Sequence, residues 1–185
     1  MANPRSQSKQ TLLAALRPVF ADRGYEGATL SQLAAATGLG KASLYHHFPG
    51  GKAEMAAILL RESVAELERV AFARLSSGRP PAQRLADFVD GFRDYVQDGE
   101  GRCLIVVMGQ GAAEAHGETV ARQYADWLRR LAATFEETGI GAKKAERRAS
   151  ELLAGLYGHL QLAAVTRSPD LFKRYAKRLK RSLTS

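Results

Sequence analysis

Hydrophobic residues recur every three or four positions along almost the whole chain, and no sustained alternation of period two interrupts them. This spacing is typical of amphipathic helices, whereas half-buried strands alternate strictly. We therefore predict an all-α fold, with an N-terminal three-helix unit, a connecting fourth helix and a larger helical body. The first predicted helix ends near residue 24, and the others cover 30–37, 41–48, 52–76, 82–97, 102–110, 118–138, 142–166 and 169–183.

Composition narrows the cellular compartment in which the protein can act and the metals and cofactors that it can bind. No apolar run reaches the roughly 20 residues that span a bilayer, and the polar start, Met1 to Gln10, lacks the apolar core of a secretory signal. The single cysteine, Cys103, excludes an intrachain disulfide and a cysteine metal cluster, and it is expected to be a buried structural residue rather than a redox sensor. We expect a cytoplasmic protein with no cofactor, no metal and no membrane partner.

The net charge of +8 favours an anionic partner, with nucleic acid the first candidate. Charge alone is weak support, because many basic proteins bind no polyanion. The basic cluster between Lys173 and Arg181 repeats at helical spacing and is expected to be a solvated face, so it is not assigned to DNA.

A stronger indication comes from the two short helices predicted between residues 29 and 48. Thr29 and Gln32 have the spacing of a capping box, Ala34 is small enough for a close helix crossing, and Gly38 suits a tight left-handed turn. Leu33, Leu39 and Leu44 fall at offsets that place them beneath the crossing. Such a pair packs at roughly right angles and exposes one face of its second helix to the major groove. Non-binding proteins also contain helix pairs with this spacing.

The stretch from Thr29 to Glu54, TLSQLAAATGLGKASLYHHFPGGKAE, resembles the TetR family of bacterial repressors. The segment from Gly101 to Ile105 is similar to a branch with LmrA-like and YxaF-like regulators. The resemblance implies a DNA-binding domain over residues 1–51 and a helical ligand-binding and dimerisation domain over 52–185. It also implies the DNA contacts: phosphate for Thr29, His47 and Lys52, the groove floor for Lys41, Ala42 and Ser43, and phosphate or thymine methyl groups for Tyr45 and His46.

Two copies of a helix-turn-helix related by a dyad can read successive major-groove faces about 34–36 Å apart, so we expect a homodimer on double-stranded operator DNA. The last two predicted helices are apolar on more than one side, which favours burial against a partner. The alternative is that these residues pack only within the monomer. The predicted interface residues are Leu153, Leu156, Leu160, Tyr157, Phe172 and Tyr175.

The middle helices carry bulky apolar residues that suit a cavity for a small effector, although such residues more often form core. The predicted effector-binding residues are Phe88, Phe92, Tyr95, Leu104, Val107, Met108, Trp127 and Leu131. An effector would release the DNA by shifting the population of dimer conformations.

The sequence therefore predicts a ligand-responsive repressor that binds a palindromic operator as a dimer. The alternatives are a helical small-molecule-binding protein with vestigial DNA contacts and a non-specific nucleic-acid-binding protein. An enzyme is not expected, since the sequence has no nucleophile motif, no phosphate-binding glycine loop and no paired acidic signature.

Overall fold

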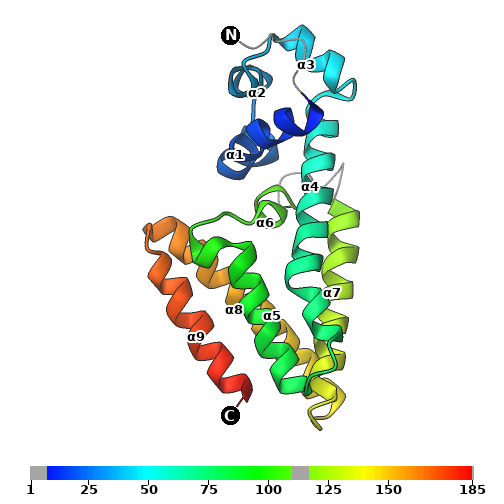
Figure 1. The fold of residues 1–185 in the computed structure, drawn as a ribbon, viewed down its shortest axis with the longest axis vertical. Coiled ribbons are helices and arrows are strands. Elements are labelled where there is room, and N and C mark those ends of the chain that lie inside the picture. The colour runs from blue at the N-terminus through cyan, green and yellow to red at the C-terminus, as the bar shows by residue number, and fades with distance from the viewer. Residues whose placement is uncertain (1–7, 110–116, 185) are drawn as a thin grey trace. The chain divides into compact units, whose positions relative to one another are not determined.

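A computed structural model describes residues 8–109 and 117–184, and every regular element in these two ranges is helical (Figure 1). The all-α prediction is confirmed. The elements are α1 (Lys9–Gly27), α2 (Leu30–Thr37), α3 (Lys41–His47), α4 (Gly51–Val70), the 3-10 helix η2 (Phe72–Ser76), α5 (Pro81–Tyr95), the 3-10 helix η3 (Gln97–Gly99), α6 (Leu104–Gly109), α7 (Glu118–Glu136), α8 (Ala142–Thr166) and α9 (Pro169–Thr184). Within the described ranges, no helix is both long and apolar enough to span a membrane.

The chain divides into two compact units. The first comprises residues 1–64 and 103–120, and the second comprises residues 65–102 and 121–185. The first unit thus takes in α1–α3, most of α4, and α6. The boundary predicted after residue 51 separates a DNA-binding domain from a ligand-binding and dimerisation domain. It stays a prediction, because the division into compact units does not test function.

The core of the first unit forms where α1, α2 and α3 bury one face each. Leu16 and Phe20 of α1, Leu33 of α2 and Leu44 of α3 are at most 1% exposed. The short helix α6 packs against α1 and adds Leu104 and Met108 to the same cluster. The regular part of α1 stops at Arg23 as predicted, because Gly24 has a φ of 67° and a ψ of −178°. Only glycine adopts this conformation readily.

The second unit is held together by aromatic side chains and one polar network. The rings of Phe72 and Trp127 stack with centroids 4.9 Å apart, and Phe88 meets Phe72 edge-on at 4.8 Å. The Trp127 indole N–H donates to the Glu68 carboxylate at 2.6 Å, and Arg130 binds the same carboxylate at 2.8 Å. These bonds fix the last turns of α4 to α7.

The predicted helix over 52–76 is wrong at its end, since α4 stops at Val70 and a 3-10 helix follows from Phe72. The cause is tertiary. A Cβ atom on Gly91 would lie 2.1 Å from the Val70 carbonyl oxygen, so the α5 backbone passes directly over the end of α4. No local sequence pattern at Val70 predicts that α4 ends there.

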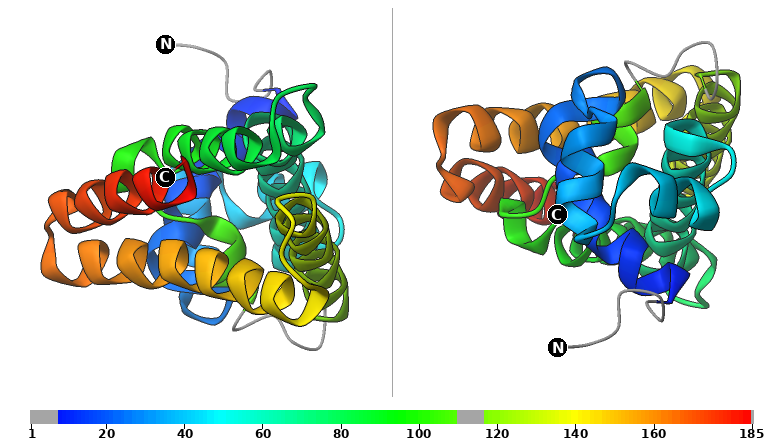
Figure 2. Two further views of the ribbon diagram at one scale, coloured as in Figure 1. Left: turned by 90° about the horizontal axis from the view of Figure 1, so that it is seen from below. Right: turned by 90° about the horizontal axis from the view of Figure 1, so that it is seen from above.

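In the second unit α9 lies between α5 and α8 (Figure 2). Gly155 of α8 admits the Tyr175 side chain of α9, because a Cβ atom at residue 155 would lie 1.7 Å from the tyrosine hydroxyl. The Tyr175 ring also stacks on His159 with centroids 3.7 Å apart. The two helices therefore form a tightly packed hairpin.

Candidate nucleic-acid interface

The start of α2 is closed by the predicted capping box. The Thr29 hydroxyl accepts a hydrogen bond from the Gln32 N–H at 3.3 Å, and the Gln32 side-chain oxygen accepts from the Thr29 N–H at 3.0 Å. Thr29 is exposed, and its hydroxyl retains its own proton. The cap can therefore stabilise α2 and still donate to a phosphate oxygen.

The turn between α2 and α3 is fixed by backbone geometry. Gly38 has φ 67° and ψ 13°, the left-handed conformation predicted for it, and the Leu39 N–H donates to the Ala34 carbonyl at 3.2 Å. Thr37 is buried, and its hydroxyl donates to the Ala34 carbonyl at 3.0 Å. This turn sets the direction in which α3 leaves α2.

Helix α3 separates a buried face from an exposed face. Leu44 is 1% exposed, as predicted for the core, and Phe48, which ends the helix, is fully buried. The exposed positions of α3 are Lys41, Ala42, Ser43, Tyr45 and His46, while His47 is half-buried. The predicted groove-facing residues thus lie on one accessible surface, and their contacts with DNA stay predictions.

Tyr45 is positioned by the start of α4. Its Cε1 atom lies 3.0 Å from the point where a Cβ atom on Gly51 would stand, and Gly51 has a φ of 60°. The ring therefore lies against a glycine backbone and keeps 45% of its surface exposed. Residues 49–51 lie between two predicted helices, and the sequence analysis did not identify this positioning role.

Lys52 is engaged inside the chain. Its ammonium donates to the Tyr25 carbonyl at 2.9 Å and stands 4.4 Å from the centroid of the Tyr25 ring. This contact ties the end of α1 to the start of α4. An ammonium has three donors, so the predicted phosphate contact of Lys52 stays open to test.

A carboxylate that sequence reasoning missed lies at the N-terminus of α4. Glu54 accepts from the Gly50 N–H at 2.9 Å and from the Lys9 ammonium at 2.8 Å. The hydrogen bond from Lys9, followed by that from Gly50, lowers the pKa of Glu54 below its ordinary value. Glu54 lies in the first turn of α4, where acidic residues are favoured, and this local signal could have been found.

Further along the same two helices, Arg17 of α1 donates to the Ser63 hydroxyl at 2.8 Å and to Glu62 at 3.1 Å. Together with the bond between Lys9 and Glu54, these contacts attach α1 to α4 at two points along both helices. These contacts therefore hold α1, on which the helix-turn-helix packs, against α4.

The net charge is not concentrated on this unit. Residues 1–64 and 103–120 contain seven lysines and arginines and six acidic residues. Almost all of the chain's net charge of +8 therefore belongs to the second unit. The inference from net charge to nucleic acid does not locate the DNA-binding surface.

The predicted effector-binding residues fall into two groups. Leu104, Val107 and Met108 belong to the first unit, and the other five belong to the second. Within the second unit, Phe88, Phe92, Trp127 and Leu131 are fully buried and Tyr95 is half-buried. The four fully buried residues belong to the hydrophobic core of the second unit. Their role in effector binding stays a prediction.

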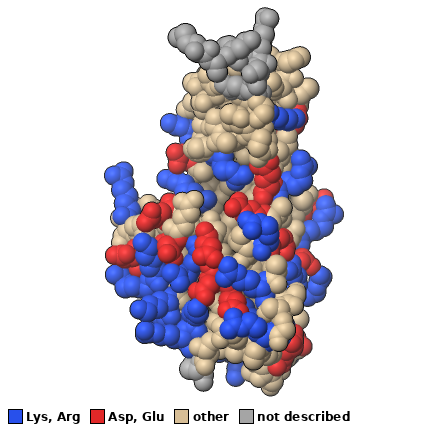
Figure 3. Space-filling view, viewed as in Figure 1, with Lys and Arg blue, Asp and Glu red and all other residues tan. Residues whose placement is uncertain are grey.

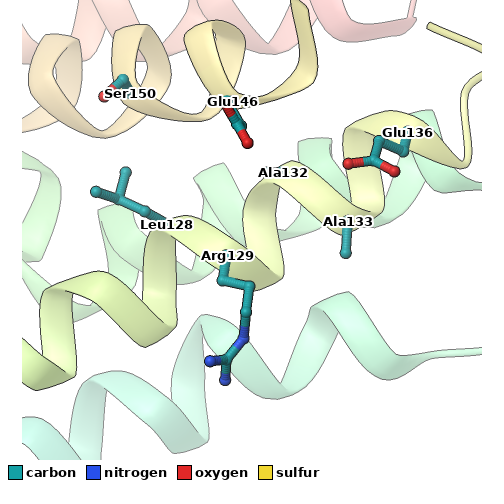
Figure 4. Close-up of a pocket in the computed structure, with 7 residues that line it drawn as sticks. All are labelled: Leu128, Arg129, Ala132, Ala133, Glu136, Glu146 and Ser150. Carbon is teal, nitrogen blue, oxygen red and sulfur yellow. The ribbon is translucent and has the colours of Figure 1, made fainter. Parts of the chain in front are cut away.

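Two hollows in the second unit have other linings. One, of about 420 Å³, lies between α7 and α8, where the Glu146 side chain points from α8 toward α7 (Figure 4). Its lining consists of Leu128, Arg129, Ala132, Ala133, Glu136, Glu146 and Ser150. The other, of about 130 Å³, lies where the ends of α5, α7, α8 and α9 meet, with Lys144 and Arg148 on its wall. Neither is lined by a predicted effector-binding residue.

The structure buries most of the predicted dimer residues inside the chain itself. Leu153 and Leu160 are 4% exposed, and Leu156 and Phe172 are fully buried. They pack α8 and α9 onto the second unit and have little surface left for a partner. Tyr157 and Tyr175 are half-buried. The large apolar residues that α8 does expose are Leu162, at 53%, and Val165, at 82%.

Comparisons with known proteins point to one family. The model of the family described as bacterial regulatory proteins, tetR family, matches residues 12–58, which include the helix-turn-helix. The transcriptional regulator LmrA of Bacillus subtilis is 24% identical over 183 residues, covering 90% of this chain and 97% of LmrA. The transcriptional repressor AcnR of Corynebacterium glutamicum is 40% identical over 65 residues, covering 35% of this chain and 34% of AcnR.

A solved structure extends the likeness to the whole fold. The structure of AibR in complex with isovaleryl coenzyme A and operator DNA superposes with a TM-score of 0.74 and 20% identity, covering 93% of this chain and 95% of AibR. Three findings agree: α2 and α3 form a capped helix pair with an exposed face, the family model matches this segment, and the relatives match over most of the chain. The N-terminal segment of this chain, residues 12–58, therefore matches the TetR family of bacterial regulatory proteins, and the whole chain has the fold of AibR.

Proposed function

We propose that this regulator is a ligand-responsive repressor, which binds a palindromic operator as a homodimer and leaves it when a small, mostly apolar effector binds. The observation that carries the proposal is the exposed face of α3, which a capped α2 and a left-handed turn at Gly38 hold in place. The repressor AcnR and the DNA-bound AibR support the same function.

The residues of α3 divide by the chemistry they offer. Lys41 and Ser43 are hydrogen-bond donors on the exposed side of the first turn, where a recognition helix meets base edges. His46 and His47 lie in the last turn and suit phosphate oxygens. Lys41 is the residue that we assign to guanine, because a lysine can donate to both O6 and N7.

Dimerisation is assigned to the outer face of α8. Val165 and Leu162 are large apolar side chains that the chain itself does not cover. Burial of these two side chains against a partner would remove apolar surface from water. The two half-sites of a palindrome, about 34–36 Å apart, require that partner to be a second copy.

The effector is proposed to act through α4. Within the second unit, the Glu68 carboxylate at the end of α4 accepts hydrogen bonds from Trp127, Gln123 and Arg130 of α7. A ligand that changes the packing of α7 would therefore move the end of α4. Such a ligand shifts the equilibrium only as far as its affinities for the two conformations differ.

The test is selection of random duplex DNA on the purified protein at about 0.15 M salt, where specific binding exceeds non-specific binding by several orders of magnitude. We expect an inverted repeat. Lys41→Ala should lose part of the repeat, whereas Arg61→Ala, which removes an exposed cation of α4, should recover the same sequence as the unmodified protein.

Two other results would contradict the proposal. Retention of duplexes without a common sequence, with affinity that falls steeply with salt, would indicate non-specific binding through charge. No retained duplex at about 0.15 M salt would indicate a small-molecule-binding protein without DNA function.

A further inference from the structure

The hairpin formed by α8 and α9 carries a charge equal to the whole net charge of the chain. Residues 142–184 contain eleven lysines and arginines and three acidic residues. In the described chain, three of these cations form ion pairs: Arg147 with Glu151, Lys173 with Glu100, and Lys180 with Asp90. Most of the positive charge of the hairpin is therefore not neutralised within the chain.

Four unneutralised cations lie in one row on α9. The cationic stripe, Arg174, Lys177, Arg178 and Arg181, has spacings of three, one and three residues, so all four share one face of the helix. All four are exposed, and none pairs with a carboxylate in the described ranges. Figure 3 shows lysine and arginine side chains gathered over α9.

The outer face of α8 carries an apolar stripe. Its members are Ala154, Gly158, Leu162 and Val165, which are all exposed and recur every three or four residues. Glycine weakens the middle of a helix, yet apart from its chain neighbours and the backbone of its own helix turns, no described atom lies within 4 Å of the point where a Cβ atom on Gly158 would stand. Packing within the chain gives no reason for this glycine, whereas a closely approaching helix of another molecule would.

Both stripes lie on the same side of the hairpin. The opposite sides of the two helices, with Leu156 of α8 and Phe172 of α9, are buried in the second unit. The Arg178 guanidinium stands 5.5 Å from the centroid of the Tyr175 ring, which in turn stacks on His159 of α8. The cationic stripe is therefore held beside α8 and faces whatever covers the apolar stripe.

We propose that a second copy of the chain docks on the apolar stripe and that the cationic stripes of the two copies oppose this docking, so that ionic strength sets the affinity of the dimer. This inference rests on the proposed dimer. Burial of Leu162 and Val165 depends little on salt, whereas repulsion between exposed like charges is screened over about 10 Å at 0.1 M and about 3 Å at 1 M. Added salt therefore strengthens the association.

A competing arrangement of the two copies predicts the opposite salt dependence of the dimer Kd. Glu136 and Glu146 line the groove between α7 and α8 and could receive the cationic stripe of a second copy (Figure 4). Attraction between those groups would weaken as salt rises. Two observations favour repulsion: the stripe outnumbers these carboxylates by four to two, and it lies on the same face as the apolar stripe.

The test measures the dimer Kd by sedimentation at 0.05, 0.15 and 0.5 M NaCl. We expect the Kd to fall at least about tenfold between the lowest and highest salt, because like-charge contacts across an interface strongly oppose association and salt screens them. Arg174→Gln with Arg181→Gln should give a dimer that is tight at 0.05 M and nearly insensitive to salt. Arg61→Gln with Arg69→Gln, which removes two exposed arginines from α4, should keep the response of the unmodified protein.

Docking on the apolar stripe is tested separately, by a substitution of Val165. Val165→Asp should be monomeric at 0.5 M NaCl. At low salt and low protein concentration, where the unmodified protein is also monomeric, its melting temperature should be unchanged, because the side chain is 82% exposed and supports no packing within the chain. A Kd that rises with salt or ignores it would overturn the inference and leave the dimer standing. A monomer at every salt concentration would overturn both, while the DNA selection described above reports on operator reading independently.

Discussion

Two lysines of the first unit meet different surroundings and should respond differently to substitution. Lys41 is exposed on α3, whereas the Lys52 ammonium is bound to the Tyr25 carbonyl. Lys41→Ala should cost about 1–3 kcal/mol of discrimination at particular base pairs, because a base-edge contact is lost. Affinities for single-base variants of the operator would show this, with an unchanged melting temperature as the control. An equal loss on every sequence would contradict a base-reading role.

Lys52→Met keeps most of the aliphatic stem and removes the charge. We expect a loss of stability of about 1–2 kcal/mol, since the Tyr25 carbonyl loses a charged donor, together with a uniform loss of DNA affinity. Urea denaturation and binding to several operator variants would measure the two effects. A uniform loss of affinity without any loss of stability would show that the lysine acts on phosphate alone.

Glu54 gives a prediction with a defined pH sign. Its pKa in the folded protein lies below the ordinary value of 4.5, so the stabilisation it provides is present above that pH and is lost as the pH falls through the lowered pKa. Glu54→Gln should therefore be less stable than the unmodified protein at pH 7 and should lose less stability between pH 5 and pH 3. Chemical denaturation at several pH values would test this. Parallel pH profiles would mean that the bonds to Lys9 and Gly50 do not persist in solution.

At the scale of helices, two glycines provide a matched comparison. Gly91→Ala would put a methyl group against the Val70 carbonyl and should cost about 1–3 kcal/mol or more. Gly158→Ala meets open space on an exposed helix and should stabilise the monomer by roughly 0.5–1 kcal/mol. Both effects would be measured by denaturation at low salt and low protein concentration. A harmless Gly91→Ala would contradict the close crossing of α5 over the end of α4.

The helices whose ends are set locally were predictable from sequence. The capping box at Thr29 and the left-handed Gly38 placed both ends of α2, and the glycine-bearing break at residues 139–141 placed the start of α8. The end of α4 was not predictable, because Gly91 lies about twenty residues later in the chain. The same limit applies to function. Periodicity found that α8 is apolar on more than one side, but it could not tell the face covered by α9 from the face bearing Val165.

Lys52 and Glu54 show the corresponding limit at the DNA-binding site. Which residues of α3 are exposed followed from helical spacing, because Leu44 and Phe48 had to be buried. The partners of Lys52 and Glu54 are Tyr25 and Lys9, which lie far back in the chain on α1. Contacts of this kind depend on how helices pack, and no local pattern encodes them.

For the whole molecule, our proposals together predict that the distribution of charge couples DNA binding to dimerisation. The first unit is nearly neutral, while the hairpin of α8 and α9 carries eleven cations against three acidic residues. Salt should weaken contacts with phosphates and, by our proposal, strengthen the dimer. The two effects act on the same equilibrium under the proposed function, in which the dimer binds a palindromic operator.

Operator affinity should therefore pass through a maximum as salt rises, provided that the protein concentration is below the dimer Kd at low salt. Above that Kd the protein is already dimeric, and affinity should fall steadily with the logarithm of salt concentration. Fluorescence anisotropy of labelled operator at both protein concentrations would show the difference. Arg174→Gln with Arg181→Gln should remove the maximum, because its dimer no longer needs screening, while Arg61→Gln with Arg69→Gln should keep it. A steady fall at both concentrations in the unmodified protein would mean that the charge on α9 does not act on the dimer.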